Sequence, residues 1–211
     1  MSFSTVLPLL LICYLIGSLP TAYLIGRLNG INIFEVGSGN MGATNVLRAL
    51  GPAWGALVWL IDSGKGIAAI LLARLIMPLD VVTANVMGAL AVVVGHDWSV
   101  VALCITGKLR GGKGAATSGG TWLLMVPPLV LGSTLVLWGA LLIGTRYMSL
   151  AVLAAFGLGA LLMSGLAASS RIDPRYALYA VFLTGMVYVR HSSNIRALLA
   201  GRERRFGERV S

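Results

Sequence analysis

The stretch MSLAVLAAFGLGALLMSGLAA, residues 148–168, identifies the class of fold, because it is long, apolar and free of charged residues. A helix needs about 20 mainly apolar residues to cross the hydrocarbon core of a bilayer, which is about 30 Å thick. The apolar residues of this stretch do not alternate with polar ones, as they would in a strand of a membrane barrel. The sequence therefore predicts a transmembrane helix here.

Further apolar segments lie on both sides of this one, so the whole chain, residues 1–211, is predicted to be a single all-α transmembrane domain. The composition agrees: the chain is 57% hydrophobic and 11% charged, with a mean hydropathy of +0.89, whereas soluble domains carry about 25% charged residues. We expect about seven transmembrane helices, at residues 5–26, 53–77, 81–95, 115–126, 128–144, 148–168 and 176–189.

Several of these segments are short for a membrane crossing. A helix of about 15 residues rises only about 22 Å, so the segments 81–95, 115–126 and 176–189 predict either a polar hollow at one face or a locally thinner bilayer. The apolar run 98–106 follows closely on the first of them. It either re-enters the membrane or extends the segment before it.

The basic residues predict the orientation of the chain. With the N-terminus outside, all of the 16 Lys and Arg residues except Arg74, Arg171 and Arg175 lie on the inner side, and an excess of Lys and Arg marks cytoplasmic loops. The C-terminus is then cytoplasmic, and its basic stretch 190–211 lies near anionic lipid headgroups. This arrangement explains the net charge of +9 through membrane lipids as partners, and no nucleic acid is expected.

Three polar segments interrupt the apolar pattern, and all three fall on the predicted inner side. They are GSGNMGATNVLRALG (37–51), GKLRGGKGAAT (107–117) and VRHSSNIRALLAGRE (189–203). The first contains G-x-G-x-x-G, but membrane helices on both sides leave no room for the βαβ unit that dinucleotide binding requires. The second approaches a nucleotide-binding loop, but Gly114 stands where the Mg²⁺-binding Ser or Thr belongs. Nucleotide hydrolysis is therefore not expected.

The second polar segment still has the chemistry of a phosphate site. Glycines let successive backbone N–H groups converge on an anion, and a lysine adds a positive charge. Gly111, Gly112, Lys113 and Gly114 provide this combination. A flexible basic loop that touches lipid headgroups explains the same residues equally well.

The first and third segments offer further anion-binding side chains. Ser38 and Asn45 lie near Arg48 in the sequence, and a guanidinium suits bidentate recognition of phosphate. His191 and Asn194 are spaced i, i+3 and are expected to share one helix face. Helix capping is the alternative explanation for the small polar residues and for the histidine.

Other charged residues in the chain point to structure rather than chemistry. Asp62 and Lys65 are spaced i, i+3 within an apolar segment, so we expect a buried ion pair. His96 and Asp97 are adjacent and cannot form a dyad on one helix face. With two histidines, seven acidic residues and no clustered ligand spacing, we expect no metal site.

Taken together and in this order, the three polar segments resemble the bacterial acyl-phosphate:glycerol-3-phosphate acyltransferase family, along almost the whole chain. The resemblance implies about seven transmembrane helices, an outside N-terminus and a multi-pass protein of the bacterial cell (inner) membrane, with its active site facing the cytoplasm. It implies transfer of an acyl group from acyl phosphate to the 1-hydroxyl of sn-glycerol 3-phosphate, without a cofactor. The products are lysophosphatidic acid and phosphate, in phospholipid synthesis.

The resemblance also implies the site residues. The catalytic residues would be Lys113, His191 and Ser38, and the substrate-binding residues would be Ser38, Asn45, Arg48, Gly111, Gly112, Lys113, Gly114, His191 and Asn194. Acyl phosphate carries a good leaving group, so the reaction needs positioning and charge stabilisation more than a catalytic triad. The general base stays open between the phosphate of the acceptor and His191.

A small-anion or phosphate-ester transporter is the alternative function. It explains the apolar helices and the basic sites. Transporter sites, however, lie near the middle of the membrane between structural repeats, whereas these motifs cluster at one face and the sequence shows no convincing repeat.

Overall fold

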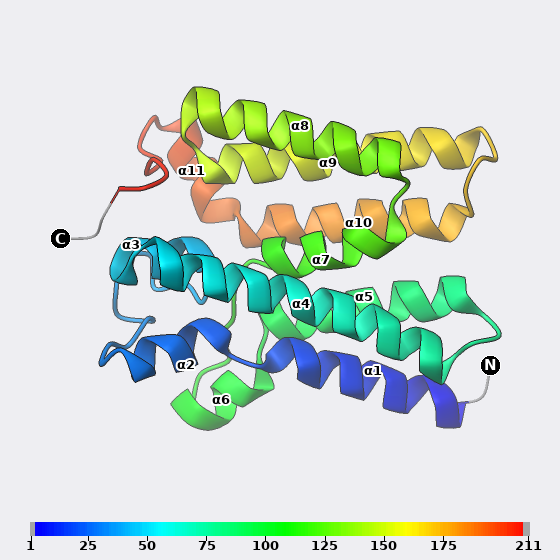
Figure 1. Ribbon diagram of the computed structural model, residues 1–211, viewed down its shortest axis with the longest axis horizontal. Helices are drawn as coiled ribbons and strands as arrows, with labels where there is room; N and C mark the ends of the chain where they lie inside the picture. The colour runs from blue at the N-terminus through cyan, green and yellow to red at the C-terminus, as the bar shows by residue number, and fades with distance from the viewer. Residues whose placement is uncertain (1–2, 209–211) are drawn as a thin grey trace. The chain divides into compact units, whose positions relative to one another are not determined.

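The computed structural model describes residues 3–208, and these residues form the helices α1–α11 (Figure 1). The all-α prediction is thereby confirmed. The chain divides into two compact units, which meet between Leu124 and Met125 along the sequence. The prediction of one transmembrane domain stays a prediction, and its residues 1–2 and 209–211 lie outside the described part.

The first unit is built around α5, which packs against α1 and α4. Glycines permit the closest approaches: an ideal Cβ placed on Gly17 or Gly95 would lie 2.0 Å from a carbonyl oxygen of the partner helix. Small residues bring membrane helices together in this way. The helices of this unit are α1 (Phe3–Ser18), α2 (Thr21–Leu28), α3 (Ala43–Leu50), α4 (Pro52–Ile76), α5 (Val81–Asp97), α6 (Val100–Thr106) and α7 (Ala115–Met125).

The first predicted segment is two helices rather than one. Leu19 and Pro20 separate α1 from α2, because proline has no backbone N–H and cannot continue the ladder of helical hydrogen bonds. Side chains from elsewhere in the unit satisfy the carbonyl groups at the break. Lys65 Nζ donates to the Leu19 carbonyl oxygen at 2.6 Å, and Ser99 Oγ donates to that of Ser18.

The apolar run 98–106 is neither part of α5 nor continuous with it. Trp98 and Ser99 separate the two helices, and the Ser99 hydroxyl accepts a hydrogen bond from the Ala102 N–H at 2.9 Å. This is the contact that a serine makes when it caps the start of a new helix. The run therefore forms the separate short helix α6.

The second unit is centred on α9, which packs against α8, α10 and α11. Its end folds back onto the α8–α9 turn: the Phe206 N–H donates to the Arg146 carbonyl oxygen at 2.6 Å, and Arg146 Nη2 donates to the Phe206 carbonyl oxygen at 3.0 Å. The helices of this unit are α8 (Pro128–Thr145), α9 (Met148–Ala168), α10 (Pro174–Arg190) and α11 (Ser192–Leu199).

Each predicted transmembrane segment is helical in the structure. Within residues 3–208, four segments are long and apolar enough to cross a membrane, and α5 is a shorter apolar helix. The chain is therefore an integral membrane protein with several spans. The four long segments are Phe3–Leu28, Pro52–Ile76, Pro128–Thr145 and Met148–Ala168.

Candidate functional site

The first polar segment is organised by a single buried side chain, Asn45. Its Nδ2 group lies 3.2, 3.0 and 3.1 Å from the carbonyl oxygens of Ile33, Val36 and Asn40. Its Oδ1 atom accepts a hydrogen bond from the Ser38 N–H at 3.0 Å. The amide therefore fixes the turn that carries Ser38.

The structure brings Ser38 and Asn45 together and places Arg48 on the next turn of α3. Ser38 is exposed and Arg48 is half-buried, whereas Asn45 is 2% exposed. The contacts of Asn45 are those of a residue that shapes the turn, and its predicted contact with substrate stays a prediction. Ser38 and Arg48 are the more accessible candidates.

The second polar segment folds back onto the end of α5. The Ser99 N–H donates to the Arg110 carbonyl oxygen at 3.1 Å, and the Gly112 N–H donates to the His96 carbonyl oxygen at 3.0 Å. Lys113 follows directly and is half-buried, two residues before α7 begins. The loop therefore holds Lys113 at the N-terminus of a helix, where anions are favoured.

Three glycines of this loop are required by its contact with α5. An ideal Cβ on Gly111 would lie 2.3 Å from the carbonyl oxygens of His96 and Asp97, and one on Gly112 would lie 2.0 Å from His96 Nε2. Gly114 has a φ of +71° and faces the Asp97 carboxylate. The glycines therefore let the backbone approach α5, and their predicted role in binding an anion stays a prediction.

Within the first unit, a cation–π contact joins the second polar segment to the turn that leads into the first. The Arg110 guanidinium carbon lies 4.9 Å from the centre of the Phe34 ring, which in turn stacks on Tyr23. Phe34 belongs to the turn that Asn45 holds. The second polar segment therefore lies against the turn that leads into the first, and the predicted clustering of the motifs at one membrane face stays a prediction.

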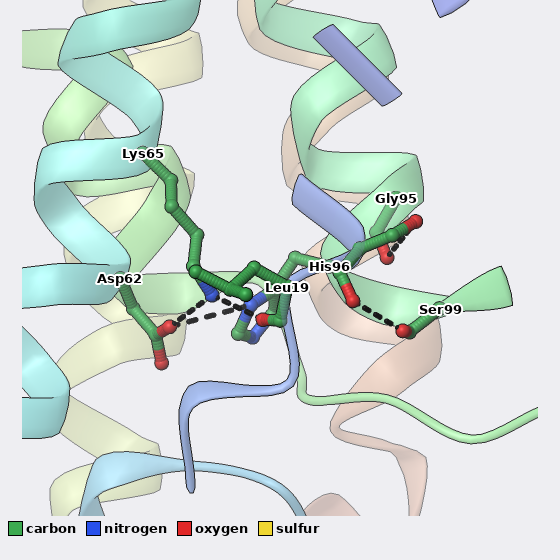
Figure 2. A network of polar contacts seen from close by, with 7 residues as sticks. Leu19, Asp62, Lys65, Gly95, His96 and Ser99 are labelled. Atoms are coloured by element: carbon green, nitrogen blue, oxygen red, sulfur yellow. Dashed lines mark hydrogen bonds and ion pairs between the residues drawn. The ribbon is translucent and has the colours of Figure 1, made fainter. Parts of the chain in front are cut away.

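Beneath the glycine loop lies the ion pair predicted from the sequence. Lys65 Nζ lies 2.6 Å from Asp62 Oδ1, and both side chains are buried. His96 Nδ1 lies 3.9 Å from the same carboxylate oxygen. Figure 2 shows Lys65 and His96 approaching the carboxylate from different helices, with the Leu19 carbonyl oxygen beside the ammonium group.

The third polar segment, in the second unit, is not one continuous helix. The chain turns at His191, which ends α10 and precedes α11, so His191 and Asn194 do not share one uninterrupted helix face. His191 is buried, and its Nδ1 atom lies 2.8 Å from the Val187 carbonyl oxygen. A carbonyl oxygen only accepts, so Nδ1 carries the proton of this contact.

A carboxylate that the site prediction did not include holds Asn194 in place. Glu203 Oε1 accepts hydrogen bonds from Asn194 Nδ2 and from Ser149 Oγ, each at 2.7 Å. Ser149 lies in the first turn of α9. The segment that follows α11 therefore returns to the residues around Asn194.

The family is shown by a match to the family model described as glycerol-3-phosphate acyltransferase, which spans residues 7–201. The chain belongs to the glycerol-3-phosphate acyltransferase family. The match includes the first two polar segments and nearly all of the third. The resemblance predicted from these segments is thereby confirmed at the level of the family, and the alternative of a transporter is not supported.

Relatives with this name are similar to the chain along nearly their whole lengths. A glycerol-3-phosphate acyltransferase from Rubrobacter xylanophilus is 43% identical, with 95% of each chain covered. Glycerol-3-phosphate acyltransferase 1 from Deinococcus radiodurans is also 43% identical, with 98% of each chain covered.

Crystal structures of PlsY, an integral membrane glycerol 3-phosphate acyltransferase, have a similar fold and are 35% identical in sequence. The TM-score is 0.82 for its glycerol 3-phosphate form, with 96% of each chain covered. It is 0.79 for its lysophosphatidic acid form, with 96% of this chain and 95% of that chain covered. The family therefore contains a protein with the fold of this chain and with both of these molecules as ligands.

Sequence reasoning missed His96, Asp97 and Glu203 as partners of the predicted site. His96 and Asp97 were considered only as a pair with each other, whereas each contacts the glycine loop. The useful signal was their position at the end of an apolar helix, shortly before the glycines. Within residues 3–208, no group of three or more His, Cys, Asp or Glu side chains is placed to hold a metal ion.

Proposed function

We propose that this chain transfers an acyl group from acyl phosphate to the 1-hydroxyl of sn-glycerol 3-phosphate, which gives lysophosphatidic acid and inorganic phosphate. Membership of the family makes acyl transfer to glycerol 3-phosphate the activity. The acyl-phosphate donor and the residue roles are the proposal. The observation that carries it is the half-buried Lys113, held by a fixed glycine loop at the start of α7.

The phosphate of the donor is assigned to Lys113 and to the first turn of α7. The Gly112 N–H already donates to the His96 carbonyl oxygen at 3.0 Å. The first N–H groups of any helix have no partner within the helix and attract anions. In α7 the Ser118 N–H donates to the Gly114 carbonyl oxygen at 2.7 Å, which is the first hydrogen bond of the helix. We therefore assign the phosphate to the backbone N–H groups between Gly114 and Ser118.

The acceptor is assigned to the other candidates. Arg48 suits the phosphate of glycerol 3-phosphate because its guanidinium can donate two parallel hydrogen bonds. Ser38, on the turn held by Asn45, supplies a hydroxyl. His191 and Asn194 are proposed as further substrate-binding residues, each on the structural support described for the second unit.

The chemistry needs one new bond and one broken bond. The 1-hydroxyl oxygen of the acceptor attacks the acyl carbon, the bond from that carbon to the phosphate oxygen breaks, and phosphate leaves. Correct positioning of two reactants is worth up to about 7–11 kcal/mol, and one donor to the developing oxyanion is worth about 3–4 kcal/mol. Lys113 and the N–H groups at α7 would supply the charge stabilisation.

The proton of the attacking hydroxyl goes either to the phosphate of the acceptor or to His191. With Nδ1 donating to the Val187 carbonyl oxygen, a neutral His191 ring has its lone pair on Nε2 and can accept a proton there. Binding phosphate through Nε2 requires the protonated ring instead. We propose that His191 mainly binds phosphate. A large loss of kcat with unchanged KM in His191→Ala, at saturating glycerol phosphate, would reject that role.

The deciding experiment mixes purified protein, acyl phosphate and glycerol 3-phosphate and measures released phosphate together with lysophosphatidic acid. We expect equal amounts of both products. Folded protein that forms neither would overturn the proposed donor. Uptake of labelled glycerol phosphate into proteoliposomes, without any acylated product, would support a transporter.

We further propose about seven crossings, an outside N-terminus and an active site that faces the cytoplasm of a bacterial inner membrane. The excess of Lys and Arg on one side supports this orientation. A membrane-impermeant thiol reagent, applied to intact cells that express the Cys104→Ser background, tests it. Leu79→Cys, at a fully exposed position between α4 and α5, should react, whereas Lys108→Cys should react only after lysis.

A further inference from the structure

The end of α5 forms the support on which the glycine loop rests. The His96 imidazole lies against Gly112 so closely that an ideal Cβ there would be 2.0 Å from Nε2 and 2.8 Å from Cδ2. The backbone at Gly112 is also tied to the His96 carbonyl oxygen at 3.0 Å. His96 therefore contacts Gly112, the residue immediately before Lys113, with both its side chain and its backbone.

The same imidazole is linked to a buried pair of charges. Its Nδ1 atom lies 3.9 Å from Asp62 Oδ1, which is too far for a hydrogen bond but close enough for an electrostatic interaction. The same oxygen accepts a hydrogen bond from Lys65 Nζ at 2.6 Å. His96, Asp62 and Lys65 are 3%, 1% and 5% exposed. Figure 2 shows that the pair comes from α4 and that the ring projects toward it from the end of α5.

Such a group of charges is costly to bury in a membrane protein and is retained where it serves function. An ion pair on α4 alone would hold only α4 and the break after α1, through the Leu19 carbonyl oxygen. The approach of His96 extends the same group of contacts to the glycine loop. The contacts thus run from the broken first helix to the backbone beside Lys113.

We propose that His96 is a positioning residue for the glycine loop 111–114, with the Asp62–Lys65 pair orienting its ring. The imidazole sets the path of the backbone at Gly112 and thereby places Lys113 and the start of α7 for the phosphate of the donor. His96 acts through the loop and does not contact the reacting atoms. The expected changes in enzyme kinetics rest on the proposed function, whereas the structural role of His96 in the loop does not.

The first test compares His96→Ala with Asn85→Ala, a matched variant on the same helix. Asn85 is also a buried polar residue of α5, and its Oδ1 atom accepts from Arg74 Nε at 2.8 Å. Misplacement of a reacting group by about 1 Å can lower a rate roughly 100-fold. We expect His96→Ala to lower kcat/KM for acyl phosphate by roughly that factor, with the KM for glycerol 3-phosphate unchanged. Asn85→Ala should keep the wild-type kinetics.

The second test is a cycle of His96→Ala, Gly112→Ala and the double variant. Gly112→Ala places a methyl group against the ring, and removal of the ring makes room for it. We expect the double variant to lose far less activity than the product of the two single losses, which is the sign of a direct coupling. Independent losses, or wild-type kcat/KM in folded His96→Ala, would overturn the proposal.

A structural readout separates this proposal from the proposed function. Hydrogen exchange of the loop amides in the wild type, His96→Ala and His96→Gln measures loop order without substrates. We expect the amides of residues 111–114 to exchange faster in His96→Ala than in the wild type. The increase should be smaller in His96→Gln, and Asn85→Ala should exchange like the wild type. Wild-type protein that forms no product disproves the proposed function alone, whereas unchanged exchange in both His96 variants overturns the positioning role.

Discussion

Replacement of Asn45 by alanine removes the one buried amide that holds the turn of Ser38. The amide offers one acceptor and two N–H groups, and in the structure these serve the Ser38 N–H and three carbonyl oxygens. Alanine thus removes about three hydrogen bonds, each with a net value of roughly 1 kcal/mol. We expect Asn45→Ala to lower the free energy of unfolding by about 3 kcal/mol.

The assay is thermal unfolding in detergent, combined with steady-state kinetics. Asn29→Ala is the matched control, because its Nδ2 donates one hydrogen bond, to the Ile25 carbonyl oxygen at 2.8 Å, so its loss should be about 1 kcal/mol. Asn45→Asp keeps the acceptor and loses both donors, and should be at least as unstable as Asn45→Ala. Normal unfolding of Asn45→Ala with a strongly raised KM would refute the reasoning, since Asn45 would then face substrate rather than the turn.

Three further predictions concern other parts of the chain. Glu203→Ala should lower kcat/KM roughly tenfold or more, because a hydrogen bond to a charged group is worth about 1.5–3 kcal/mol, whereas Glu203→Gln keeps an accepting oxygen and most of the activity. Gly120→Ala places a methyl 2.0 Å from a carbonyl oxygen of α4 and should destabilise by about 1–3 kcal/mol in thermal unfolding, while its neighbour Gly119, with open space around it, should tolerate alanine. Hydrogen bonds from the side chain and backbone of Arg175 lower the pKa of Asp173 below its ordinary value of 3.8. A carboxylate with a lowered pKa stabilises the folded protein at every pH above its ordinary pKa, and this stabilisation is lost as the pH falls through the lowered value. The difference in free energy of unfolding between wild type and Asp173→Asn should therefore be constant from about pH 7 to pH 5. It should disappear only in stronger acid.

The helices were predictable because apolar length alone selects them in a membrane protein. The segment 148–168 coincides with α9, and the neighbouring segments coincide with helices to within a few residues. The break at Leu19 and Pro20 was not predicted, since proline near the end of a long apolar run is also compatible with a kinked helix. What makes a break stable is the pair of donors, Lys65 and Ser99, and sequence spacing does not reveal them.

For the candidate site, the sequence predicted contacts between residues that are close in the chain, but it did not predict contacts between residues that are far apart in the chain. The i, i+3 spacing of Asp62 and Lys65 predicted an ion pair that the structure contains. The role of Asn45 within its turn, and of His96 against Gly112, depends on backbone paths that no local pattern encodes. The structure therefore adds which of the predicted residues shape the loops, whereas the predicted contacts with substrate stay predictions.

The break between α1 and α2 has a consequence for how the protein is made. The Ser18 carbonyl oxygen accepts a hydrogen bond from Ser99, and the Leu19 carbonyl oxygen accepts one from Lys65 in addition to a local one from the Thr21 N–H. Ser99 and Lys65 are both synthesised later in the chain than the break. Unpaired carbonyl groups are unfavourable in lipid, so the break between α1 and α2 gains its full set of hydrogen bonds only when these two later residues pack against it. The final geometry of the break is therefore completed by α4 and by the turn after α5, so these segments of the first unit stabilise one another.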